Sequence, residues 1–406
     1  MRGEERTQHP LDEYALHNFK EYLRIPSVQP NVNYDECVSF FRRQASELDL
    51  PIKVIELTPG KPIVIITWSG EDPEAPSVML NSHMDVVPVY PEFWKYPPFS
   101  AETDEEGNIY ARGAQDTKGA GIQYLEAVRR LKADGIKLRR TVHITYMPDE
   151  EIGGKDGMKK FVHTCEFQAL NIGFAMDEGL AHTENIFQIV YGERSIWYVT
   201  FHCRGKGGCS DLHFTETAAE KVRVIMDKAM DFRRTQVEKL EADSSLTVGD
   251  VNTINMTMLK GGDGTIGEVP EQLDVTFDIR VAVNQDQDAL DAMLQSWCQE
   301  AGPGVHFTAK KMKRTEPTKL DETNPWWKAF KSQCDNLGMT LQPVICPAAG
   351  DCRYLRLIGI PTLGFAPMCN TEVRMHDHNE YLNRNVFLRG IDIYCHLISA
   401  VANLNI

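Results

Sequence analysis

Alternating and helical hydrophobic patterns follow one another along the chain and predict an α/β fold. In residues 141–147, Val142, Ile144 and Tyr146 fall on one face, which is typical of a strand. Other segments repeat their apolar positions at helical spacing and predict helices. The first half is thus predicted to contain helices over 11–23 and 34–48, a helix that follows Gly119 and ends before Gly135, and strands over 52–57, 63–68, 77–80, 141–147 and 170–176.

The order of elements changes near residue 195. From there the patterns predict strands over 196–203, 251–259, 273–283 and 305–311 and helices over 217–240 and 287–301. This order, β-α-β-β-α-β, is typical of a ferredoxin-like unit. We therefore predict an inserted α+β domain over 195–311 and a first, α/β domain with a mixed sheet flanked by helices. That first domain comprises 1–194 and resumes over 312–406, with a helix opening at Pro325, strands over 341–346 and 360–365, and a last helix over 385–404.

Composition and charge narrow the classes of function. The chain has 406 residues and a formal net charge of −15, which argues against nucleic acid and anionic membranes as partners. No apolar run of about 18 residues predicts a membrane span, and the charged residues 1–6 are not followed by the apolar core of a signal peptide. Ten cysteines without paired spacings predict reduced thiols, and hence a cytoplasmic protein.

Two adjacent glutamates carry the first candidate chemistry. Glu150 and Glu151 follow the strand over 141–147, which Pro148 ends, and ligands of α/β sheets bind at the carboxyl ends of strands. Neighbouring carboxylates repel unless a cation or a proton lies between them. One could therefore bind a metal while the other acts as a general base. On its own, a solvated acidic turn would explain the pair equally well.

Further imidazoles and carboxylates stand at other strand or loop ends. His83 follows a strand, with Asp85 two residues on, and Asp116 opens a helix. Singly, these residues are ordinary polar groups or helix caps; together they predict a metal site. The ligand candidates are His83, Asp116, Glu151, Glu178 and His376.

This set of nitrogen and oxygen ligands has no thiolate, so it suits zinc and tolerates cobalt or manganese. Two imidazoles and three carboxylates exceed one tetrahedral centre, which favours two ions about 3.5–4 Å apart. Glu150 is then left to take a proton from a bridging water and pass it to a leaving amine. The predicted chemistry is hydrolysis of an amide.

Five short motifs carry a family resemblance. They are His83-x-Asp85, Ala-Arg-Gly-x-x-Asp at 111–116, Glu-Glu-x-Gly-Gly at 150–154, Asp-Glu-Gly at 177–179, and His-x-x-Asn-Glu at 376–380. Together they resemble the co-catalytic zinc aminoacylases and carboxypeptidases, with the aminoacylases the more similar. The resemblance extends over essentially the whole chain and implies a zinc-exopeptidase-like catalytic domain.

The resemblance also implies roles for single residues. Asp116 would bridge two zinc ions, with His83 and Glu178 on one ion and the remaining two ligand candidates on the other. Glu150 would be the general base and Asp85 would orient His83. The spacing to the Asn-Glu pair favours His376 over His378 as the ligand. The implied activity is cytosolic cleavage of N-acyl-L-amino acids, and the inserted domain would serve as a lid and as the surface of a homodimer.

Three stretches on the substrate side depart from the family pattern. The aminoacylases carry Gly-x-Pro-Gly-His after the first lid strand, and Cys209 stands at the His position here. A thiol is a weak hydrogen-bond donor, and loss of one oxyanion donor costs about 10²–10³ in rate. Gly267 lies where the family has an asparagine, and Ala349-Gly350 precedes Asp351 where it usually has a threonine.

Other residues could compensate on the substrate side. Arg280 and Arg353 remain as candidate clamps for a substrate carboxylate, and His213 could replace the missing imidazole. Three hypotheses follow: hydrolysis of N-acyl amino acids, the same site acting on another amide or in the condensing direction, and a metal-binding dimeric pseudoenzyme. Activity before and after Cys209→His distinguishes the enzymes from the pseudoenzyme.

Overall fold

The computed structural model describes residues 8–405, and these residues form two compact units. The first unit comprises the described residues up to Tyr191, Thr318–Pro343, and the chain from Gly350 onward. The second unit comprises Gly192–Pro317 and Val344–Ala349, so it begins at 192 rather than 195, ends at 317 rather than 311, and includes one later segment. Residues 1–6, on which the expectation of no signal peptide depends, lie outside the described part.

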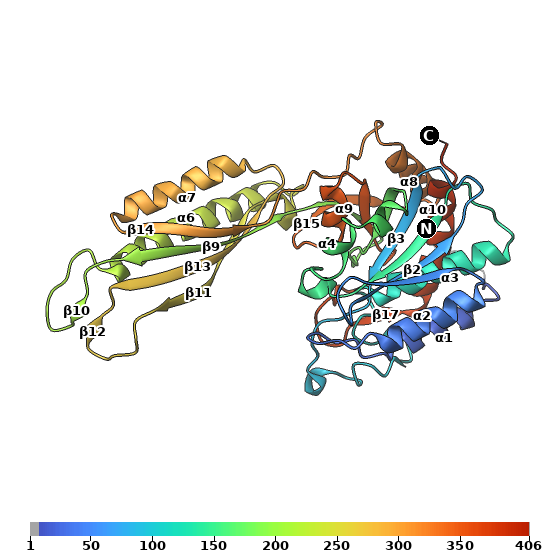
Figure 1. Cartoon of the computed structure of the whole chain (residues 1–406), viewed down its shortest axis with the longest axis horizontal. Coiled ribbons are helices and arrows are strands. Elements are labelled where there is room, and N and C mark those ends of the chain that lie inside the picture. Colours follow the sequence, from blue (N-terminus) through green and yellow to red (C-terminus); the bar gives the residue numbers. More distant parts are fainter. Residues whose placement is uncertain (1–7, 406) are drawn as a thin grey trace. The chain divides into compact units, whose positions relative to one another are not determined.

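An eight-stranded mixed sheet forms the centre of the first unit (Figure 1). In sheet order its strands are β1 (Ile52–Glu56), β2 (Pro62–Trp68), β6 (Val142–Met147), β3 (Ser77–His83), β7 (Ile172–Asp177), β16 (Thr362–Phe365), β8 (Phe187–Glu193) and β15 (Leu341–Cys346). Strand β3 runs parallel to both β6 and β7, whereas β2 runs antiparallel to β1 and β6. The predicted α/β class with a mixed sheet is confirmed.

Alternating side chains place apolar groups on both faces of this sheet. On β2, Val64 and Ile66 pack into the larger core, whereas Ile63 and Ile65 pack into a smaller core on the opposite face. The larger core is covered by α1 (Asp12–Leu23), α2 (Asp35–Glu47), α3 (Lys118–Ala133), α8 (Pro325–Asn336) and α10 (Arg384–Ala402). The smaller core is covered by α4 (Met158–Phe161), α5 (Cys165–Gln168) and α9 (Cys352–Leu357).

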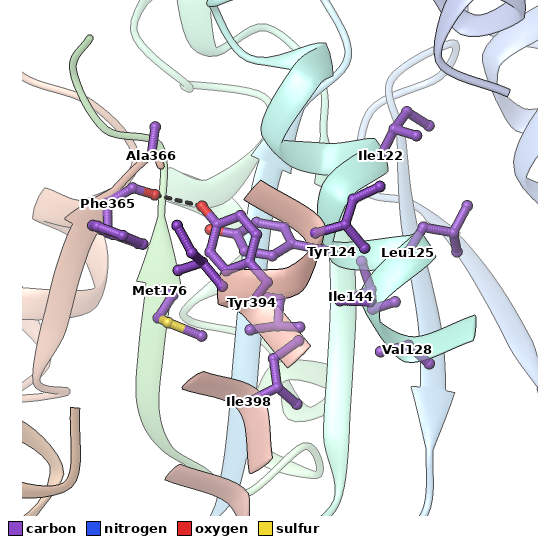
Figure 2. Close-up of a cluster of buried hydrophobic side chains, with 14 of the residues drawn as sticks. Ile122, Tyr124, Leu125, Val128, Ile144, Met176, Phe365, Ala366, Tyr394 and Ile398 are labelled. Carbon is purple, nitrogen blue, oxygen red and sulfur yellow. Dashed lines mark hydrogen bonds between the residues drawn. The ribbon is translucent and has the colours of Figure 1, made fainter. Parts of the chain in front are cut away.

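Helices α3 and α10 pack together over the middle of the sheet (Figure 2). The rings of Tyr124 and Tyr394 lie 4.5 Å apart, and both are fully buried. The Tyr394 hydroxyl donates a 2.7 Å hydrogen bond to the main-chain oxygen of Phe365, so this buried polar group is satisfied. The last helix is thereby fixed to strand β16.

The second unit follows the element order predicted from the sequence. Its elements are β9 (Ser195–Arg204), α6 (Ala218–Ala242), β11 (Thr253–Gly261), β13 (Gln272–Val281), α7 (Gln287–Ala301) and β14 (Val305–Lys311). Their sheet has the order β11-β13-β9-β14, and α6 and α7 lie side by side along one of its faces (Figure 1). A capping box of Thr217 and Glu220 begins α6. Two short strands, β10 (Gly208–Cys209) and β12 (Glu268–Val269), pair with each other.

Two features of the sheet were not predicted. Strand β8 is missing from the sequence prediction because only Arg194 separates it from β9, so no turn residues mark where the chain leaves one sheet for another. Strand β3 extends to His83 instead of ending at Leu80. A small sheet of β4 (Glu102–Thr103), β5 (Asn108–Tyr110) and β17 (Tyr381–Asn383) completes the unit.

Among residues 8–405, no helix has the length and apolarity needed to cross a bilayer.

Candidate metal centre

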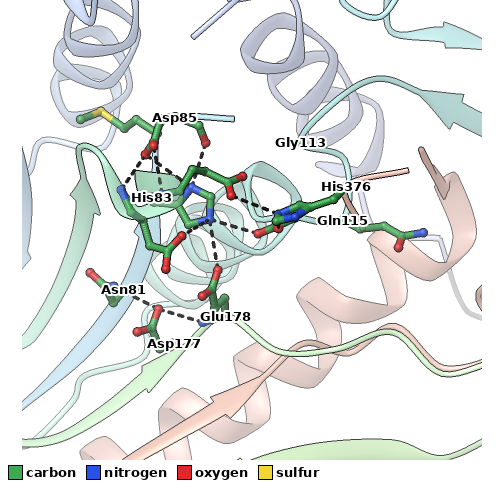
Figure 3. A network of polar contacts seen from close by, with 12 residues as sticks. Asn81, His83, Asp85, Gly113, Gln115, Asp177, Glu178 and His376 are labelled. Atoms are coloured by element: carbon green, nitrogen blue, oxygen red, sulfur yellow. Dashed lines mark hydrogen bonds and ion pairs between the residues drawn. The ribbon is translucent and has the colours of Figure 1, made fainter. Parts of the chain in front are cut away.

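Three neighbouring parallel strands bring candidate ligands to one edge of the large sheet. His83 is the last residue of β3, Glu150 and Glu151 begin a short 3₁₀ turn after β6, and Glu178 follows β7 directly. Because these strands are adjacent and parallel, their carboxyl ends meet at the same edge. The carboxylate of Asp177 accepts hydrogen bonds from Asn81 and from the main-chain N–H of Glu178, which fixes this strand end (Figure 3).

The loop before α3 supplies Asp116, and a buried glutamate holds that loop. The carboxylate of Glu380 accepts hydrogen bonds from the main-chain N–H groups of Gly113 (3.0 Å), Gln115 (2.7 Å) and Asp116 (3.2 Å). The guanidinium of Arg112 pairs with the same carboxylate at 2.8 Å. The Asn-Glu end of the last motif therefore shapes the loop that carries Asp116.

Asp116 lies between the imidazoles of His83 and His376. Its Oδ1 is 3.0 Å from Nε2 of His83, and its Oδ2 is 2.9 Å from Nε2 of His376. Glu178 Oε2 lies 3.1 Å from the first imidazole, and Glu151 Oε2 lies 3.0 Å from the second. These residues form two groups, one of His83, Asp116 and Glu178 and one of Asp116, Glu151 and His376. Within each group the donor atoms lie within 4.8 Å of one another. Each group offers one nitrogen and two oxygens, a donor set that fits zinc.

Charge crowding at this site also fits bound cations. Burial, and next the charge of Glu178, raise the pKa of Glu150 well above its ordinary value. Burial likewise raises the pKa of Glu178. For Asp116, burial alone would raise the pKa, but hydrogen bonds to His376 and His83 hold it below the ordinary value. The protein thus gathers buried carboxylates that only protons or cations can neutralise.

Asp85 contacts the His83 ring through its main chain. Nδ1 of His83 donates to the main-chain oxygen of Asp85 at 2.8 Å, whereas the nearest carboxylate oxygen of Asp85 is 3.7 Å away. This hydrogen bond places the proton on Nδ1 and leaves Nε2 free to bind a metal. The Asp85 carboxylate instead accepts from the main-chain N–H groups of Glu150 and Glu151, both at 3.1 Å.

The two histidines of the last motif lie in different surroundings. His376 reaches Asp116 and Glu151, whereas the His378 ring packs 5.1 Å from Phe93 and 6.3 Å from Tyr90. Of these two histidines, His376 belongs to a candidate metal group among the described residues and His378 does not.

We expect His376→Ala to reduce the bound metal from two ions to one, because it removes the only nitrogen of one group. His378→Ala, two residues away, is the matched control and should keep both ions. Metal content after dialysis, measured by atomic emission, checks this. Equal losses in the two variants would contradict the assignment.

The substrate-side candidates divide between the two units. In the first unit, Asp351 is buried and precedes α9, which carries Arg353 against the ring of Tyr354. A Cβ on Gly350 would lie 2.4 Å from Oε1 of Glu178, so a larger residue here would require the Glu178 side chain to shift. Gly350, directly before Asp351, thus lies close to a ligand candidate.

The other four substrate-side candidates belong to the second unit. Both guanidinium contacts of Arg280 go to Asp278, at 2.8 and 2.9 Å, so Arg280 is engaged within its own strand. Cys209 is exposed on β10, His213 is exposed four residues later, and Gly267 has φ 96° and accepts from Ser210. In the second unit, then, Arg280 already has a partner of its own.

Sequence reasoning missed a set of polar residues around the turn that carries Glu150 and Glu151. They are Gln29, Tyr34, Lys61 and Asp149. Asp149 stands directly before Glu150 in the acidic stretch, which is the one signal the sequence offers. The others come from distant segments, and their pairing is visible only in three dimensions.

Three comparisons relate this chain to known proteins. The family model described as Peptidase family M20/M25/M40 matches residues 79–400. Aminoacylase-1A from Rattus norvegicus is 48% identical over 387 residues, which cover 95% of each chain. An M20 family metallo-carboxypeptidase from Sulfolobus solfataricus aligns with a TM-score of 0.72 and 20% identity, covering 96% of this chain and 99% of that one. A dinuclear metal-binding M20 peptidase from Bacillus subtilis aligns with a TM-score of 0.71 and 16% identity, covering 98% and 100%.

Proposed function

Because the chain belongs to peptidase family M20/M25/M40 and is a metal-dependent, aminoacylase-type hydrolase of small amides, we propose that it cleaves N-acyl-L-amino acids to a carboxylate and a free amino acid. The observation that carries this proposal is the position of Asp116 between His83 and His376, each with its own second carboxylate. That arrangement suits two cations about 3.5–4 Å apart, close enough to act on one substrate.

We assign His83 and Glu178 to one zinc ion, Glu151 and His376 to the other, and Asp116 to both. Bound zinc would polarise the amide carbonyl and lower the pKa of a water molecule. The hydrogen bond from His83 Nδ1 to the main chain keeps its ring in the orientation that presents Nε2. Buried Glu380 accepts from the main-chain N–H of Asp116 and so helps to hold the residue that is common to both groups.

Glu150 is the residue we assign to proton transfer. It belongs to neither candidate metal group among the described residues, and its Oε2 lies 3.9 Å from Nε2 of His83. Its carboxylate is therefore next to the centre without being occupied as a ligand. We propose that it takes the proton from the attacking water and delivers it to the leaving amine.

The family likeness also leads us to propose a cytosolic homodimer in which the second unit acts as lid and contact surface. Its edge strand β11 exposes Met256, Met258 and Leu259, which supports pairing with a second copy. Cys209, in place of the family histidine, then lies on the substrate side.

Turnover of zinc-loaded protein on N-acetyl and longer N-acyl amino acids tests the proposed function. We expect the wild type to hydrolyse at least one member of such a panel. Cys209→His should raise kcat by up to about 10²–10³-fold, because an imidazole can donate to a developing oxyanion and a thiol donates only weakly. Cys165→His, at another exposed cysteine, is the matched control and should change nothing.

Absence of hydrolysis by both the wild type and Cys209→His would contradict the proposed substrate class. Hydrolysis only by Cys209→His would mean that the catalytic groups are intact and that the natural substrate differs. Products formed from a free amino acid and a carboxylic acid would indicate the condensing direction.

A further inference from the structure

The turn between β1 and β2 contacts the base-bearing segment at both of its ends. At one end, the hydroxyl of Thr58 donates to Asp156 at 3.0 Å, and Lys160 donates to both residues at 2.7 and 2.6 Å. At the other end, Nζ of Lys61 donates to Asp149 at 2.8 Å. Glu150 and Glu151 stand between these two anchors in the sequence. The turn over 57–61 therefore clamps the segment over 149–156.

Asp149 is the point where this clamp reaches the site. Its side chain is 2% exposed and its φ is 61°, in the left-handed region that few aspartates adopt. One oxygen, Oδ1, accepts from Lys61 (2.8 Å), Gln29 (2.9 Å) and Tyr34 (2.7 Å). The main-chain N–H of Asp149 donates to the same tyrosine hydroxyl at 3.0 Å. The backbone directly before Glu150 is thus held from several sides.

Gln29 extends these contacts from Asp149 to Asp85. Its amide nitrogen donates to Asp149 and, at 2.8 Å, to Oδ2 of Asp85. Asp85 in turn accepts from the main-chain N–H groups of Glu150 and Glu151. A continuous path therefore runs from Lys61 through two buried carboxylates to the peptide groups that orient the base.

Lys61 is the cationic residue of this path, which also contains the carboxylates of Asp149 and Asp85. Its side chain is 20% exposed, whereas that of Asp149 is 2% exposed, so the ammonium reaches a buried carboxylate from the surface. Removing one member of a buried pair leaves the other charge without compensation, which is strongly unfavourable. Without Lys61, the aspartate would be expected to seek water and pull the turn away from its position.

We infer that Lys61 and Gln29 are positioning residues that hold Glu150 in line for proton transfer. The inference rests on the proposed function of Glu150 as the base. Neither residue is itself a candidate metal donor. The path also reaches the N–H of Glu151, whose carboxylate is held separately by His376 at 3.0 Å, so we expect the effect to fall on the chemical step, with metal content measured beside it. A displacement of about 1 Å at a catalytic group can cost about 10²-fold in rate.

Lys61→Met tests this inference, with Lys61→Arg as the conservative variant. We expect Lys61→Met to lower kcat about 10- to 100-fold, with KM within about twofold and both metal ions retained. Lys61→Arg keeps the charge and should recover most of kcat. Lys53→Met, at an exposed lysine of β1, is the matched control and should behave as wild type. If Lys61→Met does not fold, Lys61→Gln takes its place.

Amide hydrogen exchange gives a second readout that needs no substrate. In Lys61→Met, exchange in a peptide covering 147–156 should become faster, because the N–H groups of Glu150 and Glu151 lose their fixed acceptor. If the wild type hydrolyses no N-acyl amino acid but exchange still rises in the variant, the proposed function fails and the positioning role stands.

The positioning role would be overturned by unchanged kcat and exchange in Lys61→Met, by an equal loss of kcat in Lys53→Met, or by a loss of kcat that follows loss of metal. Failure of Lys61→Arg to recover kcat, with exchange restored, would likewise show that Lys61 does not act through the turn.

Discussion

Replacing Glu150 with glutamine is expected to lower kcat by about 10²–10⁴-fold while the protein keeps both metal ions. Glutamine has the same shape but cannot accept the proton of an attacking water. The carboxylate belongs to neither candidate donor group, so metal binding has no reason to change. Steady-state turnover and metal content of the same preparation check both halves of the expectation.

The thermal stability of Glu150→Gln distinguishes loss of the base from misfolding of the variant. Burial raises the pKa of Glu150, so its ionised form destabilises the fold once the pH exceeds its ordinary pKa. The neutral amide removes that penalty, and at neutral pH the metal-free variant should unfold at a temperature no lower than wild type. Glu106→Gln, at an exposed residue of a β-turn, is the control. Full turnover by Glu150→Gln would refute the assignment of the base.

Asp116→Ala is expected to abolish binding of both metal ions and with it all measurable turnover. Its two oxygens lie 3.0 and 2.9 Å from His83 and His376, so one substitution removes a donor from each group. A ligand present at 100 times its Kd stabilises a fold by about 2.7 kcal/mol. The variant should therefore lose the rise in unfolding temperature that zinc gives the wild type.

Calorimetric zinc titration distinguishes Asp116→Ala from changes at a single group. His376→Ala should retain one binding event, because His83 and Glu178 still have Asp116. Asp116→Ala should retain none of comparable affinity. Two undisturbed binding events in Asp116→Ala would show that the ions do not depend on a common carboxylate.

Four of the five ligand candidates were accessible to sequence reasoning because they stand next to the beginning or end of a regular element, whereas His376 lies in a loop and was found through its motif. His83 and Glu178 come at or just after strands whose alternation is plain, and parallel strands bring their ends together. The adjacent Glu150 and Glu151 carry their own signal, since like charges side by side call for a cation. The structure brings these residues within reach of one another.

Other side-chain contacts join residues that are far apart in the sequence, and no local pattern predicts them. Lys61 lies in a turn that the sequence identifies only by its glycine and prolines, and its partner Asp149 is 88 residues away. Asp85 contacts His83 through its main-chain oxygen, because its carboxylate accepts from the main-chain N–H groups of Glu150 and Glu151 instead. Side-chain competition of this kind appears only after the strands are paired.

Strand β16 has a consequence for how the protein is made. It lies between β7 and β8 in the large sheet, yet it consists of residues 362–365, and His376 comes later still. During synthesis from the N-terminus, the continuous segment 192–317 of the second unit leaves the ribosome before the first unit can close its sheet. The edges of the unfinished sheet and the clustered acidic side chains stay uncovered until the last tenth of the chain is made, so metal ions could be bound at both candidate groups only after translation is almost complete.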